Sequence, residues 1–262
     1  MSYYPILNAP GCIGWTTICN FSPNNWEVRH ITEKYLNVTW CQEGTWRSKN
    51  IGTLSPDKTH TVGIADIASL VPAESLPLLS LTNSILPARS DILPHTDTER
   101  TNYPAWRAAL GLSTAHASTS YQGEIDPFPA PGSLLTFSPF IQFGEGVENY
   151  LIFLNVEASA VTRSARLEIY DSARPELLKR TVDVCNNSAA VISLDDLGFS
   201  PTDLPVIISK EMSAIPLYLS RTRDGEYLSL EHTHPPASYV VHGKRWEAQK
   251  LLKTLWFSRV TR

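Results

Sequence analysis

Residues 62–67 of this chain read Val-Gly-Ile-Ala-Asp-Ile, and residues 192–197 read Ile-Ser-Leu-Asp-Asp-Leu. Both stretches place an aspartate between aliphatic residues. Further short matches recur in the same order in the two halves, with loop-sized changes in spacing. They are Ile18-Cys19-Asn20 with Phe153-Leu154-Asn155, Leu76-Pro77 with Leu204-Pro205, His95-Thr96 with His232-Thr233, and Ala105-Trp106-Arg107-Ala108 with Arg245-Trp246-Glu247-Ala248. A tandem internal duplication explains this ordered recurrence better than chance.

Short β-branched and aromatic runs between turn residues dominate the chain. Its 19 prolines and 13 glycines favour strands and loops over long helices. In residues 165–170, Leu167 and Ile169 alternate with Glu168, so we expect the two aliphatic side chains in the core and the carboxylate in water. Six or seven such strands predict an antiparallel β-sandwich. Helical spacing of apolar residues predicts short helices at 103–112 and 243–257.

These patterns together predict a mostly β fold of two tandem, internally duplicated antiparallel β-sandwich units, each followed by a short helix. The first unit takes residues 1–112, and the second, with its C-terminal helix, takes residues 147–262. Residues 113–146 form a proline- and glycine-rich connecting segment between them. This segment also holds apolar runs, so we expect it to pack at the junction of the units.

Composition excludes several classes of partner. The 262 residues, 42% of them hydrophobic and 18% charged, suffice for a substantial core. The net charge of −4 comes without a long run of either sign, so we expect no nucleic-acid partner and no anionic membrane partner. No apolar run reaches the roughly 20 residues that span a bilayer, and the first residues lack a signal-peptide pattern. We therefore expect a cytoplasmic protein.

The cysteines and the Asn-x-Ser/Thr triplets are consistent with a cytoplasmic protein. No Cys-x-x-Cys pair occurs, so we expect buried thiols at Cys12, Cys19, Cys41 and Cys185. Asn-x-Ser/Thr triplets begin at Asn20, Asn37 and Asn186, but their modification requires secretion, for which the sequence gives no sign.

Four motifs of the second half run in a recognisable order. They are Leu154-Asn155 at the end of a strand, Glu168-Ile169-Tyr170 in the next, Leu194-Asp195-Asp196-Leu197 after a polar strand, and Ile215-Pro216-Leu217 at the start of a late one. This order resembles the small β-sandwich of the sensory rhodopsin transducer family. The resemblance implies a binding or signalling protein that is not catalytic and that forms oligomers. Members of that family have a single copy, and the connecting segment and residues 231–236 have no counterpart in them.

The string Glu231-His232-Thr233-His234-Pro235-Pro236 is the best candidate for a metal site. Residues two apart in an extended segment project from the same face, so His232 and His234 would offer two imidazoles to one divalent metal, with Glu231 or His242 nearby. The alternative is that the two histidines hydrogen-bond and hold a proline-ended strand, because no third ligand is evident on that face.

The corresponding string of the first half is His95-Thr96-Asp97-Thr98-Glu99-Arg100, followed by Trp106. Here an aspartate replaces the second histidine, which makes a weaker ligand pair. A solvated polar loop is the alternative. A two-fold relation between the copies would bring His95, Asp97, His232 and His234 to one cleft.

A third candidate lies at residues 116–124. It groups hydroxyl, amide and carboxylate side chains of the kind that bind a polyhydroxylated ligand: His116, Ser120, Tyr121, Gln122 and Glu124. Trp106 or Phe128 would supply an aromatic face. The alternative is a hydrogen-bonded loop that orders the domain junction. The sequence contains neither the Gly-x-Ser-x-Gly motif of α/β-hydrolases nor a phosphate-binding glycine-rich loop.

The leading functional prediction is a binding protein for a carbohydrate or another small polar ligand at the junction of the units. The ligand-binding residues would be His95, Asp97, Arg100, Trp106, His116, Ser120, Tyr121, Gln122 and Glu124.

The alternative is a metal-dependent hydrolase, isomerase or lyase that acts on a sugar-like substrate. In that enzyme His232 and His234, together with His95, Asp97 or His242, would hold the ion, and Glu124 or Glu231 would act as the general base.

Aromatic residues gather near the chain ends, at Tyr3, Tyr4, Trp15, Trp256 and Phe257. Such residues are enriched at protein interfaces, so they predict a homo-oligomer with two-fold symmetry. The alternative is that they fold back onto their own domain.

Overall fold

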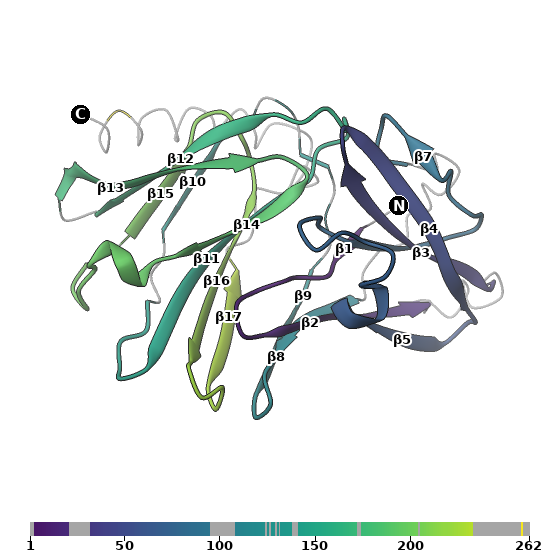
Figure 1. Cartoon of the computed structure of the whole chain (residues 1–262), viewed down its shortest axis with the longest axis horizontal. Coiled ribbons are helices and arrows are strands. Elements are labelled where there is room, and N and C mark those ends of the chain that lie inside the picture. Colours follow the sequence, from purple (N-terminus) through teal and green to yellow (C-terminus); the bar gives the residue numbers. More distant parts are fainter. Residues whose placement is uncertain are drawn as a thin grey trace, which may run out of the picture. The chain divides into compact units, whose positions relative to one another are not determined.

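In the computed structural model, strands are the main secondary structure of the described residues (Figure 1), which confirms the mostly β prediction. It describes residues 3–20, 32–94, 108–123, 125, 127, 128, 130, 132–137, 141–171, 174–203, 205–232 and 258. Contacts divide the chain into two compact units. The first contains Met1–Pro127, Val156–Thr162 and Asn187–Ala189, and the second contains Phe128–Asn155, Arg163–Asn186 and Ala190–Arg262.

The first unit holds two antiparallel sheets. The five-stranded sheet has the order β1-β6-β3-β4-β7, with β1 Tyr4–Pro5, β6 Leu78–Thr82, β3 Lys34–Gln42, β4 Thr45–Leu54 and β7 Arg89–Ser90. The four-stranded sheet has the order β5-β2-β8-β9, with β5 Lys58–Gly63, β2 Ile13–Asn20, β8 Ala108–Ser113 and β9 Ser118–Gln122. A 3-10 turn, η2 Ile64–Ile67, follows β5.

Local chemistry explains the hairpin of β3 and β4. The connecting residues Glu43 and Gly44 have φ of 51° and 68°, the left-handed pair that a two-residue hairpin turn requires. In β3, Leu36 and Val38 point to the core of the unit, where they pack with Ile18 of β2. The intervening residues of β3 point to the opposite face of the sheet.

The second unit also holds two antiparallel sheets. One has the order β10-β15-β12-β13, with β10 Leu134–Phe137, β15 Pro205–Ser209, β12 Ser164–Asp171 and β13 Arg174–Cys185. The other has the order β14-β11-β16-β17, with β14 Ser188–Ser193, β11 Val147–Asn155, β16 Ile215–Thr222 and β17 Leu228–His232. A 3-10 turn, η4 Asp195–Leu197, follows β14.

The core of the second unit confirms the alternation predicted in β12. Leu167 and Ile169 are fully buried and pack with Leu151, Phe153 and Ile207. Burial of each such side chain contributes about 1.5–3 kcal/mol relative to exposure. The opposite face of β12 carries Glu168, so the polar side of this strand faces outward as expected.

The prediction of two tandem β-sandwich units, each followed by a short helix, is wrong. The described strands form four separate small sheets. Residues 103–112, predicted as a helix, contain most of strand β8, and the other predicted helix, 243–257, lies outside the described residues. The tandem duplication of complete sandwich units is wrong with it. Strand orders are nevertheless alike in pairs of sheets, β6-β3-β4 with β15-β12-β13 and β5-β2-β8-β9 with β14-β11-β16-β17.

Strand β8 falls in a predicted helix because the apolar residues of 103–112 have helical spacing, and its composition does not argue against one. Ala-Ala-Leu-Gly-Leu-Ser contains good helix formers, but the segment lies between β2 and β9 and pairs with both. Tertiary pairing therefore overrides local propensity. The predicted connecting segment, 113–146, likewise contributes β9 to a sheet of the first unit and β10 to a sheet of the second.

Two of the terminal aromatic residues are buried within the first unit. Tyr3 is 1% exposed and its hydroxyl donates to the Pro94 carbonyl, while Tyr4 belongs to the core cluster. Trp15 is half-buried and its indole donates to Ser113 Oγ at 2.8 Å. Trp256 and Phe257 lie outside the described residues, so the homo-oligomer stays a prediction.

The cysteines and the Asn-x-Ser/Thr triplets have clear environments. All four cysteines are thiols as predicted, but Cys12, Cys19 and Cys41 are only half-buried and Cys185 is exposed. The triplet asparagines, Asn20, Asn37 and Asn186, are 6%, 0% and 5% exposed. A glycan could not be attached to these buried amides in the folded protein.

In the part of the chain that the structure describes, we find no helix with the length and apolar character needed to traverse a bilayer.

Candidate functional site

Many of the predicted site residues lie outside the described residues. They are His95, Asp97, Arg100, Trp106, Glu124, His234 and His242. The described ones fall in different units. His116, Ser120, Tyr121 and Gln122 belong to the first unit, and Glu231 and His232 belong to β17 in the second.

The predicted metal ligands on β17 point to opposite faces. Glu231 pairs with Tyr218 and His232 with Leu217 of β16, and consecutive residues of a strand alternate in direction. Within the described residues, no group of three histidine, cysteine, aspartate or glutamate side chains is placed to hold a metal ion. The metal site stays a prediction, because its other histidines fall outside those residues.

The predicted polar loop is the edge strand β9 and the turn before it. Ser120 and Gln122 are exposed on one face of β9, and Tyr121 is half-buried on the other, where burial raises the pKa of its hydroxyl. His116 lies in a turn closed by Thr114, whose backbone N–H donates to the Ala117 carbonyl at 2.8 Å. The structure therefore splits this predicted group between two faces and a turn.

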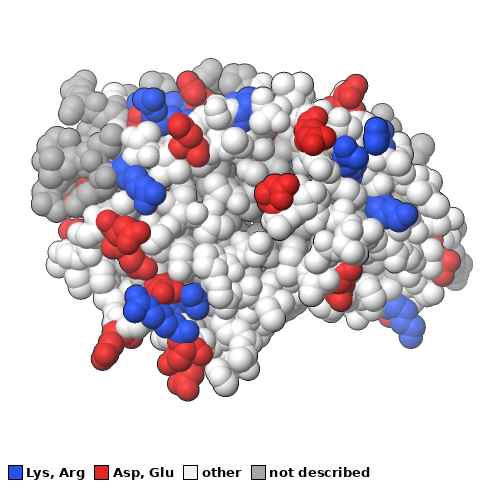
Figure 2. All heavy atoms as spheres, in the orientation of Figure 1, with Lys and Arg blue, Asp and Glu red and all other residues white. Residues whose placement is uncertain are grey.

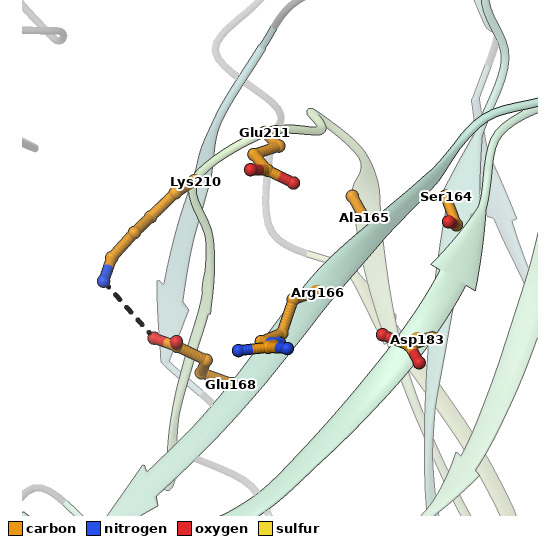
Figure 3. A pocket seen from close by; sticks show the side chains of 7 residues that line it. All are labelled: Ser164, Ala165, Arg166, Glu168, Asp183, Lys210 and Glu211. Carbon is orange, nitrogen blue, oxygen red and sulfur yellow. Dashed lines mark ion pairs between the residues drawn. The ribbon is translucent and has the colours of Figure 1, made fainter.

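A hollow that sequence reasoning missed lies in the second unit. It has a volume of about 420 Å³ and opens over the sheet of β12, β13 and β15 (Figure 3). Three separate segments line it: β12, β13 and the loop after β15. The lining residues are Ser164, Ala165, Arg166, Glu168, Asp183, Lys210 and Glu211.

Glu168 has polar contacts with two neighbouring side chains of the second unit, those of Lys210 and Tyr170. Its Oε2 atom lies 3.6 Å from Lys210 Nζ, and the Tyr170 hydroxyl donates to the same oxygen at 3.1 Å. Burial, the hydrogen bond to Glu168 and the charge of that carboxylate raise the pKa of Tyr170 to about 12. Tyr170 is therefore a hydrogen-bond donor throughout the physiological pH range.

Arg166 occupies the centre of the charged lining. It is the cross-strand partner of Asp183, and Figure 3 shows its guanidinium between the carboxylates of Glu168 and Asp183. Glu211 lies on the other side of the hollow, on the loop after β15. The lining thus presents two cations and three carboxylates to one space.

Hydrogen bonds hold the rim of the hollow in place. Arg163 Nη1 donates to the Glu211 carbonyl at 2.9 Å, and the Arg163 N–H donates to Asn186 Oδ1 at 2.9 Å. The Met212 N–H donates to Ser209 Oγ at 3.2 Å, which closes the loop that carries Lys210. The charged side chains therefore extend from a fixed backbone.

One feature of the sequence indicates this hollow, namely the alternation of polar residues in β12. Ser164, Arg166 and Glu168 alternate along β12 on the face away from the core. Such a polar stripe usually means a solvated sheet face, and only the pairing with β13 sets Asp183 beside it.

A second charged cluster lies on the other sheet of the same unit. Glu148 accepts from Arg223 Nε at 3.0 Å and from the Tyr150 hydroxyl at 3.0 Å, and Arg221 Nη2 lies 2.6 Å from it. Desolvation acts to raise the pKa of Glu148, but these hydrogen bonds and the two positive charges outweigh it and lower that pKa. Figure 2 shows acidic and basic side chains interspersed over the face in view. The Glu148 carboxylate is fully engaged by these groups, although Arg221 Nε is buried without a hydrogen-bond partner in the described part of the chain. The hollow, where five charged side chains line one open space, is the better candidate site.

No family model, no curated protein and no solved structure matches this chain. The resemblance of the second half to the sensory rhodopsin transducer family therefore stays a prediction.

Proposed function

We propose that the protein binds a small polar ligand without transforming it, and that the ligand occupies the charged hollow on the sheet of β12, β13 and β15. One observation carries this proposal: five charged side chains from three segments line a single hollow of about 420 Å³. Ligand pockets of proteins commonly measure about 300–1,000 Å³. The hollow is therefore large enough for a monosaccharide or an amino-acid-sized molecule.

The lining favours a ligand rich in hydroxyl groups or one with both signs of charge. Arg166 and Lys210 are donors only, while the carboxylates of Glu168, Asp183 and Glu211 are acceptors. A sugar hydroxyl both donates and accepts, so it can bridge a cation and a carboxylate that lie side by side. A purely apolar ligand would leave these charges desolvated and unpaired, at a high cost in free energy.

The four thiols fit a reducing compartment, so we place this activity in the cytoplasm.

A ligand screen followed by calorimetry tests the proposal. Thermal shift with neutral sugars, sugar acids, amino sugars and amino acids identifies the class, because a ligand at about 100 times its Kd stabilises the fold by about 2.7 kcal/mol. We expect Arg166→Gln and Asp183→Asn to weaken binding at least tenfold. The matched control is Arg89→Gln, which changes an exposed arginine of β7 in the first unit.

Two results would contradict the proposal. One is a panel in which no compound stabilises the wild-type protein. The other is a ligand whose affinity is the same in Arg166→Gln, Asp183→Asn and Arg89→Gln, because that ligand would bind elsewhere.

A further inference from the structure

The sheet of β1, β6, β3, β4 and β7 buries a polar patch on the face opposite the core. Leu36 and Val38 of β3 point into the core cluster, so the residues that alternate with them point to the other face. That face is shielded from solvent although its side chains are polar. Asn37, Thr39, Ser80 and Thr82 are 0% exposed and Ser48 is 8% exposed.

Strand register sets these side chains beside one another. Asn37 of β3 is the cross-strand partner of Ser80 on β6. Thr39 of β3 is the partner of Ser48 on β4. Directly opposed residues of an antiparallel pair have Cβ atoms about 4.5–5.5 Å apart.

Most polar groups of the patch have partners within it. Asn37 Nδ2 donates to Thr82 Oγ1 at 2.8 Å and to the Tyr35 carbonyl at 3.3 Å. Thr39 Oγ1 and Ser48 Oγ share a hydrogen bond of 3.0 Å. Because the Tyr35 carbonyl can only accept, the side-chain amide of Asn37 must present its nitrogen there, and this fixes where its oxygen points.

Two atoms of the patch lack a partner in the described part of the chain. They are Asn37 Oδ1 and Ser80 Oγ, which belong to opposed residues, and both atoms are buried. A buried acceptor or hydroxyl without a hydrogen bond costs free energy, and native proteins rarely leave one in that state. The two groups do not hydrogen-bond to each other, and one small polar group between these opposed residues would satisfy both.

We propose that an internal water molecule bridges Asn37 Oδ1 and Ser80 Oγ on this face of the first unit. Water supplies two donors and two acceptors, so it donates to the amide oxygen while it accepts from, or donates to, the serine hydroxyl. The hydroxyl pair of Thr39 and Ser48 on the same face has one hydrogen left over, and the proposal assigns that hydrogen to the water as a third hydrogen bond. Buried waters typically make about three hydrogen bonds. A metal ion fits less well, because every oxygen of the patch is neutral.

The test is a count of long-lived water molecules in solution. Oxygen-17 relaxation dispersion measures them for the wild type, for Ser80→Val, and for the control Ser120→Val, which changes an exposed serine of β9 in the same unit. Ser80→Val removes one bridging partner and fills the space with methyl groups. We expect Ser80→Val to lose one long-lived water and Ser120→Val to lose none. Equal counts in the three proteins would overturn the proposal.

A second measurement needs no variant and covers the case in which Ser80→Val fails to fold. In the wild-type protein, we expect water cross-peaks at the side-chain amide protons of Asn37 and electron density for a water within hydrogen-bond distance of both orphaned atoms. A crystal structure in which the Ser80 hydroxyl donates directly to Asn37 Oδ1 would overturn the bridging water.

Discussion

The side chain of Asn149 on β11 hydrogen-bonds to three segments of the second unit that lie far apart in the sequence. We expect Asn149→Ala to be among the most destabilising polar substitutions in that unit. The side chain is 4% exposed. Its Nδ2 donates to the Gln142 carbonyl at 2.9 Å and to Asp195 Oδ1 at 3.0 Å. Its Oδ1 accepts from the Gln142 N–H at 3.0 Å and from Ser220 Oγ at 2.8 Å. The alanine variant loses these four bonds and keeps the backbone bond to Asp195 Oδ2 at 2.9 Å.

The expected magnitude follows from the partners that lose a bond. A neutral hydrogen bond contributes about 0.5–1.5 kcal/mol net, and one to a charged group contributes about 1.5–3 kcal/mol. Three of the four partners of Asn149 are neutral, and the Asp195 carboxylate is charged. Because the bonds share one side chain and water replaces some of them in the variant, we expect a loss of about 3–4 kcal/mol rather than the full sum.

Urea unfolding followed by tryptophan fluorescence and far-UV circular dichroism measures this loss. The two units can unfold separately, so each transition is fitted on its own. The control is Asn8→Ala, an exposed asparagine of the first unit that should change stability by less than about 0.5 kcal/mol. A loss below about 1 kcal/mol for Asn149→Ala would refute the reasoning, because it would mean that the four bonds add little to the fold.

Three further predictions rest on single residues. Leu167→Ala, at a side chain that is 0% exposed, should lower the unfolding free energy of the second unit by about 2–5 kcal/mol; a loss below about 1 kcal/mol in urea unfolding would contradict that burial. Gly14→Ala should abolish folding of the first unit, because the added Cβ would lie 1.6 Å from the Leu7 carbonyl oxygen, and a cooperative melt of that unit in the variant would contradict this close approach. Glu148→Gln should cost stability above the unfolded carboxylate pKa of about 4.3, and the difference from wild type should vanish as the pH falls through the lowered folded pKa, whereas a constant difference in thermal melts from pH 7 to pH 2 would exclude this titration.

The sequence determined the class of structure and the direction of many side chains. Short β-branched runs between turn residues predicted a mostly β chain, and the alternation in β12 correctly assigned Leu167 and Ile169 to the core. These features depend on the two-residue period of a strand, which any short window of sequence reveals. The absence of a Cys-x-x-Cys pair likewise predicted thiols.

Sequence reasoning failed where neighbours along the chain do not decide the outcome. Residues 108–113 have the composition of a helix, but they become β8 because two strands offer backbone hydrogen bonds on both sides. The predicted sandwich units with terminal helices failed for the same reason. Recurring motifs indicate where strands end, but they do not say which strands pair to make a sheet.

Both sites proposed for this protein are assembled by tertiary structure, although the polar stripe of β12 is visible in the sequence. The hollow exists because pairing sets Asp183 opposite Arg166 and the loop after β15 brings Lys210 to Glu168. The bridging water is inferred because register sets Asn37 opposite Ser80 on a face without solvent. Strands pair through backbone groups that are nearly the same for every residue, so the side chains of two paired strands meet in a register that neither strand encodes by itself.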